Sequence, residues 1–209
     1  MLTASRDYIN TVIKVRVGED KEEIYVHKDL ICYWSPLFFE PAFKGPWKEG
    51  KDGVMDLESI QPDVFKNFVQ WLYTQSLYMG KPKDSNELTN EPLSFELIVR
   101  LYSFAQMIQI PHLQNDCIDA LRNSNKVLRW TPIEQLSWIW ENTAEGCSLQ
   151  RYMVDRLVWA CKPTVFDKYP SYFTNTDCCR AIMSALALRA GGGVAESPLN
   201  ILENYYVVR

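Results

Sequence analysis

The chain has 209 residues, of which 47% are hydrophobic and 23% are charged, a composition typical of a folded globular protein rather than a disordered one. Its formal net charge of -4 argues against nucleic acid as the main partner, because phosphate binding needs clustered lysine and arginine. No segment reaches the roughly 20 consecutive apolar residues that a membrane helix requires, so no membrane partner is expected. The length fits one large domain, or a domain of modal size with an extension.

The start of the chain and its cysteines predict an intracellular location, cytoplasmic or nuclear. Residues 1–17 are interrupted by Lys14 and Arg16 and offer no cleavage site, so a signal peptide is not expected. The six cysteines show no framework spacing, which is typical of reduced intracellular thiols.

The first part of the chain predicts a hairpin, two short helices and a third strand. Alternating apolar residues with Ile13, Val15 and Val17 on one face predict the first strand. Ser35 followed by Pro36 suits an N-cap and the first position of the second helix. The expected strands are 9–17, 23–27 and 54–57, the helices are 28–34 and 36–43, and the turn-rich segments are 18–21 and 44–53.

The remainder predicts only helices. A helical stripe predicts a helix over 62–73; its inward residues would be Val64, Phe65, Phe68, Val69, Leu72 and Tyr73. Further helices are expected over 95–109 and from Pro111 onwards. A capping box at Thr131 to Glu134, with Pro132 at N1, predicts the start of the next helix, and Ser148 is expected to cap the one after it. The last helix is expected over 176–190, where glycines end it. Residues 81–92 predict a disordered loop, and the apolar end 205–208 is expected to dock as a strand or hang free.

Three motifs in this order resemble the BTB/POZ domain. They are His27-Lys28-x-Leu30-Ile31 followed by Ser35-Pro36-x-Phe38, then Phe68-x-x-Trp71-Leu72-Tyr73-Thr74, then Ala105-x-x-x-x-Ile110-Pro111-x-Leu113. Parts of these motifs are similar to the BTB proteins of filamentous fungi. The resemblance implies an α+β fold, a small mixed sheet flanked by helices, over 8–125. A helical extension resembling a truncated BACK domain would occupy 126–190, and a linker and tail 191–209.

The resemblance implies a protein–protein interaction module and no enzyme. The most concrete function would be that of a substrate adaptor for a cullin-3 ubiquitin ligase. The alternative is an oligomerising scaffold or a transcription-associated BTB protein that does not bind cullin. The expected partners are cullin-3 or another BTB protomer, and self-association is expected. Family members that form strand-swapped dimers carry an extra helix and strand before the hairpin, whereas only 1–8 precede it here.

The candidate interaction residues are aromatic. Trp47-x-Glu49 matches the hydrophobic-x-Glu motif that the resemblance places at cullin-3 contacts; alternatively, Trp47 folds back over Phe39 and Phe43. Tyr33 and Trp34 on the first short helix suit self-association or a partner, or burial under the C-terminal helices. Trp138 falls opposite the expected inward stripe Ile133, Leu136 and Trp140, where the next helix or a partner would cover it.

No residue pattern predicts catalysis, a cofactor or a metal. His27 lacks a triad pattern, and the resemblance makes it a structural hydrogen-bonding residue. With two histidines and no paired cysteine motif, no zinc site is expected. A thiol-dependent enzyme using Cys178 or Cys179 is the alternative from another class. Adjacent residues on a helix point about 100° apart, so we expect one of these cysteines to pack inward and the other to face outward.

Overall fold

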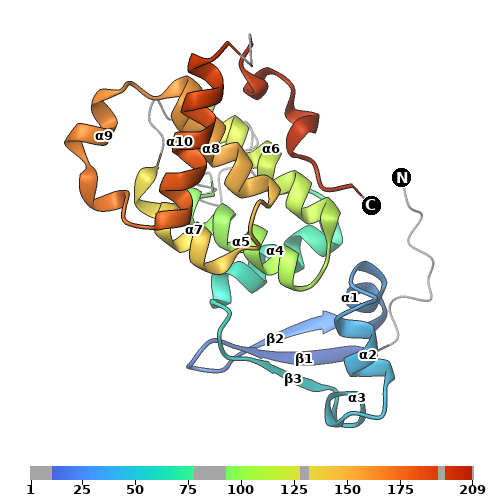
Figure 1. The fold of residues 1–209 in the computed structure, drawn as a ribbon. Helices are drawn as coiled ribbons and strands as arrows, with labels where there is room; N and C mark the ends of the chain where they lie inside the picture. The colour runs from blue at the N-terminus through green and yellow to red at the C-terminus, as the bar shows by residue number, and fades with distance from the viewer. Residues whose placement is uncertain (1–10, 78–92, 128–131, 193–195, 209) are drawn as a thin grey trace, which may run out of the picture. The chain divides into compact units, whose positions relative to one another are not determined.

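The computed structural model describes residues 11–77, 93–127, 132–192 and 196–208, and these form two compact units (Figure 1). Unit 1 contains the described residues up to Leu77 together with 104–113. Unit 2 contains the described residues of 93–103 and those from 114 onwards. The predicted loop over 81–92 lies outside the described residues, and the predicted domain boundaries stay predictions.

Unit 1 is built on a three-stranded mixed sheet with the order β2-β1-β3. The strands are β1 (Val12–Val17), β2 (Glu22–His27) and β3 (Val54–Leu57); β1 pairs antiparallel with β2 and parallel with β3. The predicted alternation is confirmed, because Ile13, Val15 and Val17 are buried on one face. On the other face Lys14 pairs with Glu23 and Arg16 with Asp56.

Within the described residues, four helices lie wholly in unit 1: α1 (Lys28–Trp34), α2 (Phe39–Lys44), α3 (Lys48–Asp52) and α4 (Pro62–Thr74). Helices α1 to α3 gather at one end of the strands (Figure 1). The predicted start of α2 was wrong by three residues. Ser35 does not cap α2; its buried hydroxyl donates a 2.7 Å hydrogen bond to the carbonyl of Ile108, and a turn separates it from Phe39. The turn-rich segment 44–53 also contains the short helix α3, which the sequence pattern did not predict.

Aromatic side chains form the core of unit 1. The rings of Phe65, Phe68 and Phe104 pack edge to face with centroids 5.3 to 6.0 Å apart, and Phe39 stacks on Phe68 at 6.2 Å. The inward stripe of α4 includes Trp71, which is 1% exposed. Tyr73 was wrongly placed in that stripe, because it is 50% exposed. Its hydroxyl lies 2.7 Å from Nδ1 of His27, which confirms a structural hydrogen bond for this histidine.

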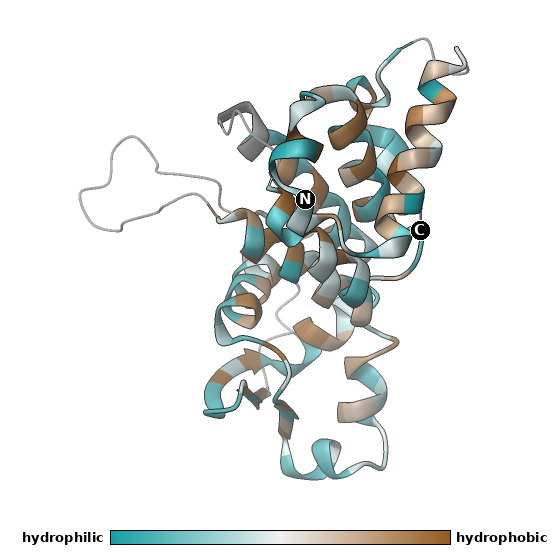
Figure 2. Cartoon of the chain, turned by 60° about the vertical axis from the view of Figure 1, so that its left-hand side comes forward, coloured by the Kyte–Doolittle hydropathy of each residue, from teal (hydrophilic) through white to brown (hydrophobic). Residues whose placement is uncertain are grey.

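Unit 2 is helical, and α5 and α6 each pass from one unit to the other. The helices are α5 (Phe95–Met107), α6 (Pro111–Val127), the 3-10 turn η2 (Ile133–Gln135), α7 (Leu136–Asn142), α8 (Ser148–Ala160), α9 (Thr164–Lys168), η3 (Pro170–Tyr172) and α10 (Thr176–Ala190). Hydrophobic and hydrophilic residues alternate along these helices (Figure 2). Among the described residues, no helix is long and apolar enough to cross a membrane.

The predicted helix starts in unit 2 are corrected at two places. Pro132 precedes the 3-10 turn η2 instead of opening an α-helix, and Thr131 lies outside the described residues. Cys147, not Ser148, is the N-cap of α8. The predicted bounds of α10 are confirmed, and the side chain of Asn175 caps it by accepting a 3.0 Å bond from the backbone N–H of Cys178.

The C-terminal tail docks in a form that neither sequence alternative described. It forms two 3-10 turns, η4 (Pro198–Asn200) and η5 (Leu202–Tyr205), and Tyr205 is only 2% exposed. The hydroxyl of Tyr205 donates to Asp155, and that of Tyr206 donates to Asp119, each at 2.7 Å. The tail is therefore fastened to α8 and α6 by two tyrosine–aspartate pairs.

Candidate protein-interaction site

Trp47 is the residue that directly precedes α3, and its side chain is exposed on unit 1. Its backbone is extended, with φ -70° and ψ 163°, and its side chain is 62% exposed. Phe39 and Phe43 are 0% and 1% exposed. Since Trp47 stays mostly in solvent, it does not serve as the lid that the sequence offered as an alternative.

The loop that carries Trp47 is packed tightly around glycine. A Cβ at Gly45 would lie 2.2 Å from the carbonyl oxygen of Pro41 and 3.0 Å from Cδ1 of Trp47. A Cβ at Gly50 would lie 2.8 Å from the carbonyl oxygen of Gly45. Only glycine fits at these positions without moving backbone atoms, so the loop conformation and the position of Trp47 are linked.

Glu49 lies two residues further on, in the first turn of α3. Its side chain is half-buried, and its carbonyl oxygen accepts a 2.9 Å hydrogen bond from Gly53, which ends the helix in the left-handed conformation at φ 66°. A carboxylate in the first turn of a helix is favoured by the partial positive charge of the helix N-terminus. The structure therefore places Trp47 and Glu49 together on one short, folded segment.

The two aromatic residues of α1 have different environments. Trp34 is half-buried, and its ring contacts those of Trp71 and His112 with centroids 5.0 and 5.7 Å apart. Tyr33 is 48% exposed, and its ring lies edge to face with that of Trp34, with centroids 5.5 Å apart. Trp34 thus packs against the buried Trp71, whereas about half of Tyr33 is open to solvent.

Trp138 belongs to unit 2 and is covered by a residue that the sequence did not suggest. The guanidinium of Arg100 lies 4.7 Å from the centroid of its ring, and the same guanidinium pairs with Glu96 at 2.7 Å. The inward stripe of this helix is also corrected, since Ile139 is buried and Trp140 is half-buried. Trp138 lies in unit 2, whereas Trp47 lies in unit 1.

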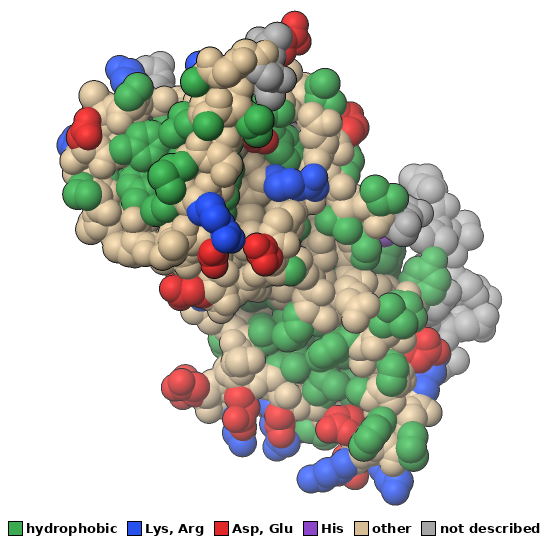
Figure 3. All heavy atoms as spheres, in the orientation of Figure 1, with side chains coloured by type: hydrophobic (Ala, Val, Ile, Leu, Met, Phe, Trp, Pro, Cys, Tyr) green, Lys and Arg blue, Asp and Glu red, His purple; other side chains and the backbone are tan. Residues whose placement is uncertain are grey.

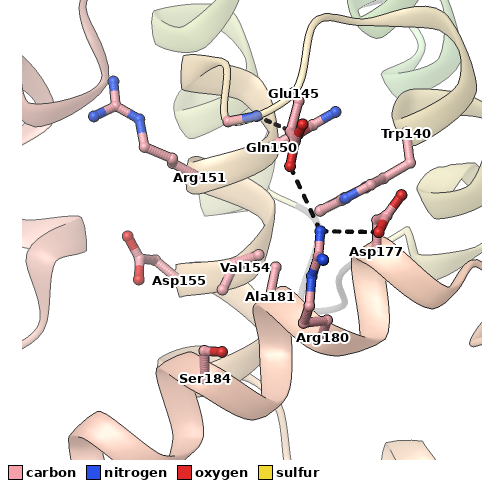
Figure 4. A pocket seen from close by; sticks show the side chains of 11 residues that line it. Trp140, Glu145, Gln150, Arg151, Val154, Asp155, Asp177, Arg180, Ala181 and Ser184 are labelled. Carbon is pink, nitrogen blue, oxygen red and sulfur yellow. Dashed lines mark hydrogen bonds and ion pairs between the residues drawn. The ribbon is translucent and has the colours of Figure 1, made fainter.

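Trp140 lines a cavity of about 490 Å³ among α7, α8 and α10, which sequence reasoning missed. Arg180 reaches between Glu145 and Asp177, at 3.5 and 2.9 Å, as Figure 4 shows. Asp155 also lines the cavity, and burial raises the pKa of its carboxyl group above the ordinary value. No motif marks these residues, because α9 and η3 separate the lining residues of α10 in the sequence from those of α7 and α8.

The two cysteines of the pair have different environments. Cys178 is 1% exposed, and burial raises the pKa of its thiol to about 12, so the thiol stays protonated at neutral pH. The thiol of Cys179 donates a 3.2 Å hydrogen bond to the carbonyl oxygen of Phe173. Within the described part of the chain, no group of three histidine, cysteine or acidic side chains is arranged to hold a metal ion.

Comparison with known proteins identifies one family. Residues 2–125 match the family described as BTB/POZ domain. Kelch-like protein 40 of Xenopus tropicalis and its counterpart in Xenopus laevis are each 23% identical to the chain over 150 residues, which are 72% of this chain and 21% of the relative. The chain therefore spans about a fifth of the length of these curated relatives. The predicted similarity to fungal proteins stays a prediction.

Proposed function

We propose, from the premise that the chain belongs to the BTB/POZ domain family, that it is a substrate adaptor for a cullin-3 ubiquitin ligase. The BTB/POZ domain is a protein–protein interaction module, and its small mixed sheet with flanking helices is present in unit 1. In this role the chain holds a target near the ligase and contributes position, while other subunits perform the chemistry.

The observation that carries the proposal is the exposure of Trp47 on a folded segment. Interface hot spots are enriched in tryptophan, tyrosine and arginine, and an indole of which 62% is open to solvent has a large apolar area to bury. Glu49 follows at the spacing of the hydrophobic-x-Glu motif, so Trp47 would fill a groove on cullin-3 and Glu49 would accept a hydrogen bond at its rim. Trp138 stays a proposed contact in unit 2.

A second candidate function is self-association through the face formed by α1 and the turn after it. Tyr33 and Leu37 are 48% and 68% exposed, and hydrophobic side chains gather over this part of unit 1 in Figure 3. Exposed apolar surface of this kind is typical of a protein contact. Trp34 supports this face from below, since its ring packs on Trp71.

Binding to purified cullin-3 tests the adaptor proposal. We expect Trp47→Ala to raise the dissociation constant about 30-fold or more, because truncating an anchor of this type removes at least about 2 kcal/mol of binding free energy. Glu49→Ala should raise the dissociation constant several-fold. Tyr25→Ala is the matched control, since Tyr25 is also an exposed aromatic residue of unit 1 at 57% but lies on the sheet. Biolayer interferometry gives the three constants.

The outcomes separate the two candidate functions. Wild-type affinity in both the Trp47 and Glu49 variants would remove these residues as the contact, and absence of binding by the wild type would remove the adaptor function. Sedimentation velocity of the wild type and of Tyr33→Arg tests self-association. A monomer at every concentration would exclude the second candidate, whereas a dimer lost in the variant would support it.

A further inference from the structure

A second cavity in unit 2, of about 510 Å³, opens between η2, the C-terminal end of α8 and the segment formed by α9 and η3. None of the interaction residues predicted from the sequence lines it. Its volume is within the range of pockets that bind small molecules or a few side chains. Most of its lining residues come from the segment 156–172, and Ile133 and Glu134 of η2 complete the wall.

Positive charge predominates in the lining of this cavity. Among the lining residues that the structure describes, Arg156, Lys162 and Lys168 are basic and Glu134 is the one acidic residue. The whole chain carries a formal net charge of -4, so three cations facing one acid are a local reversal. Charge of one sign lining a concave surface concentrates the electrostatic potential there, which attracts a ligand of the opposite charge.

The cavity among α7, α8 and α10 provides an internal comparison. It is lined by Arg151 and Arg180 but also by three carboxylates, those of Glu145, Asp155 and Asp177, so its formal charge is negative. Asp155 and Arg156 are neighbours in sequence, and successive side chains of a helix point about 100° apart. Helix α8 therefore contributes Arg151 and Asp155 to one cavity and Arg156 to the other.

Two tyrosines at the rim add apolar area beside the cations. Tyr169 and Tyr172 are each 39% exposed, and their ring centroids lie 6.4 Å apart. The ammonium group of Lys168 lies 5.1 Å from the ring of Tyr169. Arg156 is half-buried, while Lys162 and Lys168 are exposed, so the cations are distributed from the inner wall to the opening. Val165 adds an aliphatic contact to the lining.

We propose that this cavity binds an acidic peptide segment of a partner protein. Carboxylates of the segment would pair with Arg156, Lys162 and Lys168, and the two tyrosine rings would pack against its aliphatic and backbone atoms. A small inorganic anion would leave most of the volume and both rings without contact. Nucleic acid is disfavoured because three cations in an acidic chain offer too few phosphate contacts.

The proposal is independent of cullin binding, because its residues belong to unit 2 and Trp47 and Glu49 belong to unit 1. It gives the chain a second surface with a different chemistry. One surface would use an exposed indole as an anchor, and the other would select for negative charge. The two surfaces can be inactivated separately, so failure of one does not decide the other.

Fluorescence anisotropy with a fluorescein-labelled hexaglutamate peptide and the full chain tests the proposal. We expect saturable binding that weakens as salt rises. The double variant Lys162→Glu/Lys168→Glu should weaken affinity at least tenfold. The matched control is Lys48→Glu/Lys51→Glu, which changes the net charge equally at two exposed lysines of unit 1 and should change affinity less than twofold. Tyr172→Ala, which keeps every charge, should weaken affinity about threefold or more.

Each alternative result has a defined meaning. Unsaturable binding, or equal losses in the two lysine variants, would show general attraction to surface charge and overturn the proposal. Free glutamate that competes as well as the peptide at equal carboxylate concentration would indicate a simple anion site and also overturn it. Circular dichroism of each variant verifies that the fold is kept, and the Tyr172 variant decides the result if a lysine variant unfolds.

Discussion

At the scale of single residues, the tryptophans of unit 1 have opposite roles. Trp71 is 1% exposed and Trp47 is 62% exposed. We expect Trp71→Ala to lower the free energy of unfolding by about 3–5 kcal/mol, because it removes a large buried side chain and leaves a cavity. Trp47→Ala should change it by less than about 0.5 kcal/mol. Urea unfolding followed by circular dichroism measures both, and equal losses would contradict the assigned roles.

Residue roles were the least predictable part of the molecule. The sequence pattern favours Ser35 as a helix cap, but its hydroxyl bonds to Ile108, 73 residues further along the chain. Tyr73 has the spacing of a core residue, yet its hydroxyl is bonded to His27 at the surface. In both cases a hydrogen bond between distant segments decides the role, and periodicity contains no information about such partners.

At the scale of elements, the α2–α3 loop makes a specific prediction. Gly45→Ala should destabilise unit 1 and weaken any binding through Trp47, because the new Cβ would lie 2.2 Å from the backbone oxygen of Pro41. Gly53→Ala is the matched control. Nothing lies within 4 Å of its Cβ, so only the strain of φ 66° remains, about 1–2 kcal/mol.

Thermal unfolding and the binding assay distinguish the two glycine variants. We expect Gly45→Ala to lower both the unfolding temperature and the affinity, whereas Gly53→Ala should lower mainly the unfolding temperature. Unchanged affinity in Gly45→Ala would mean that the loop conformation does not determine how Trp47 is presented.

Elements with a strong period were predicted well, and short ones were not. Alternation predicted the faces of β1, and the bounds of α10 were confirmed at both ends. Helix α3 was missed because Lys48-Glu49-Gly50-Lys51-Asp52 has no apolar residue from which a period can be read. The tail was missed for a related reason, since 3-10 turns held by side-chain hydrogen bonds produce no repeating pattern.

At the scale of the whole molecule, the burial of Asp155 predicts a pH dependence of stability. Burial raises the pKa of Asp155 above its ordinary value of 3.8, an effect that the hydrogen bond from Tyr205 opposes. A raised pKa in the folded state means that the contribution of this group to stability is complete below about 3.8 and is lost as the pH rises through the folded pKa. Relative to Asp155→Asn, the wild type should therefore lose stability as the pH rises from 4 towards 7.

Urea unfolding at several pH values between 4 and 7 measures this difference. The free energy of unfolding of Asp155→Asn minus that of the wild type should increase with pH across this range. A flat difference would show that the burial of Asp155 has no energetic effect.

The close approach of Gly45 to the side chain of Trp47 has a consequence for the kinetics of binding. A side chain that is already held in its bound direction loses little conformational entropy when a partner covers it. Encounter then requires no slow rearrangement of the loop, so variants of this surface should differ from one another chiefly in how long the complex survives. If the loop around Gly45 were less tightly packed, ordering of the loop would add a slow step to binding, and stopped-flow traces would show this step as a phase independent of partner concentration.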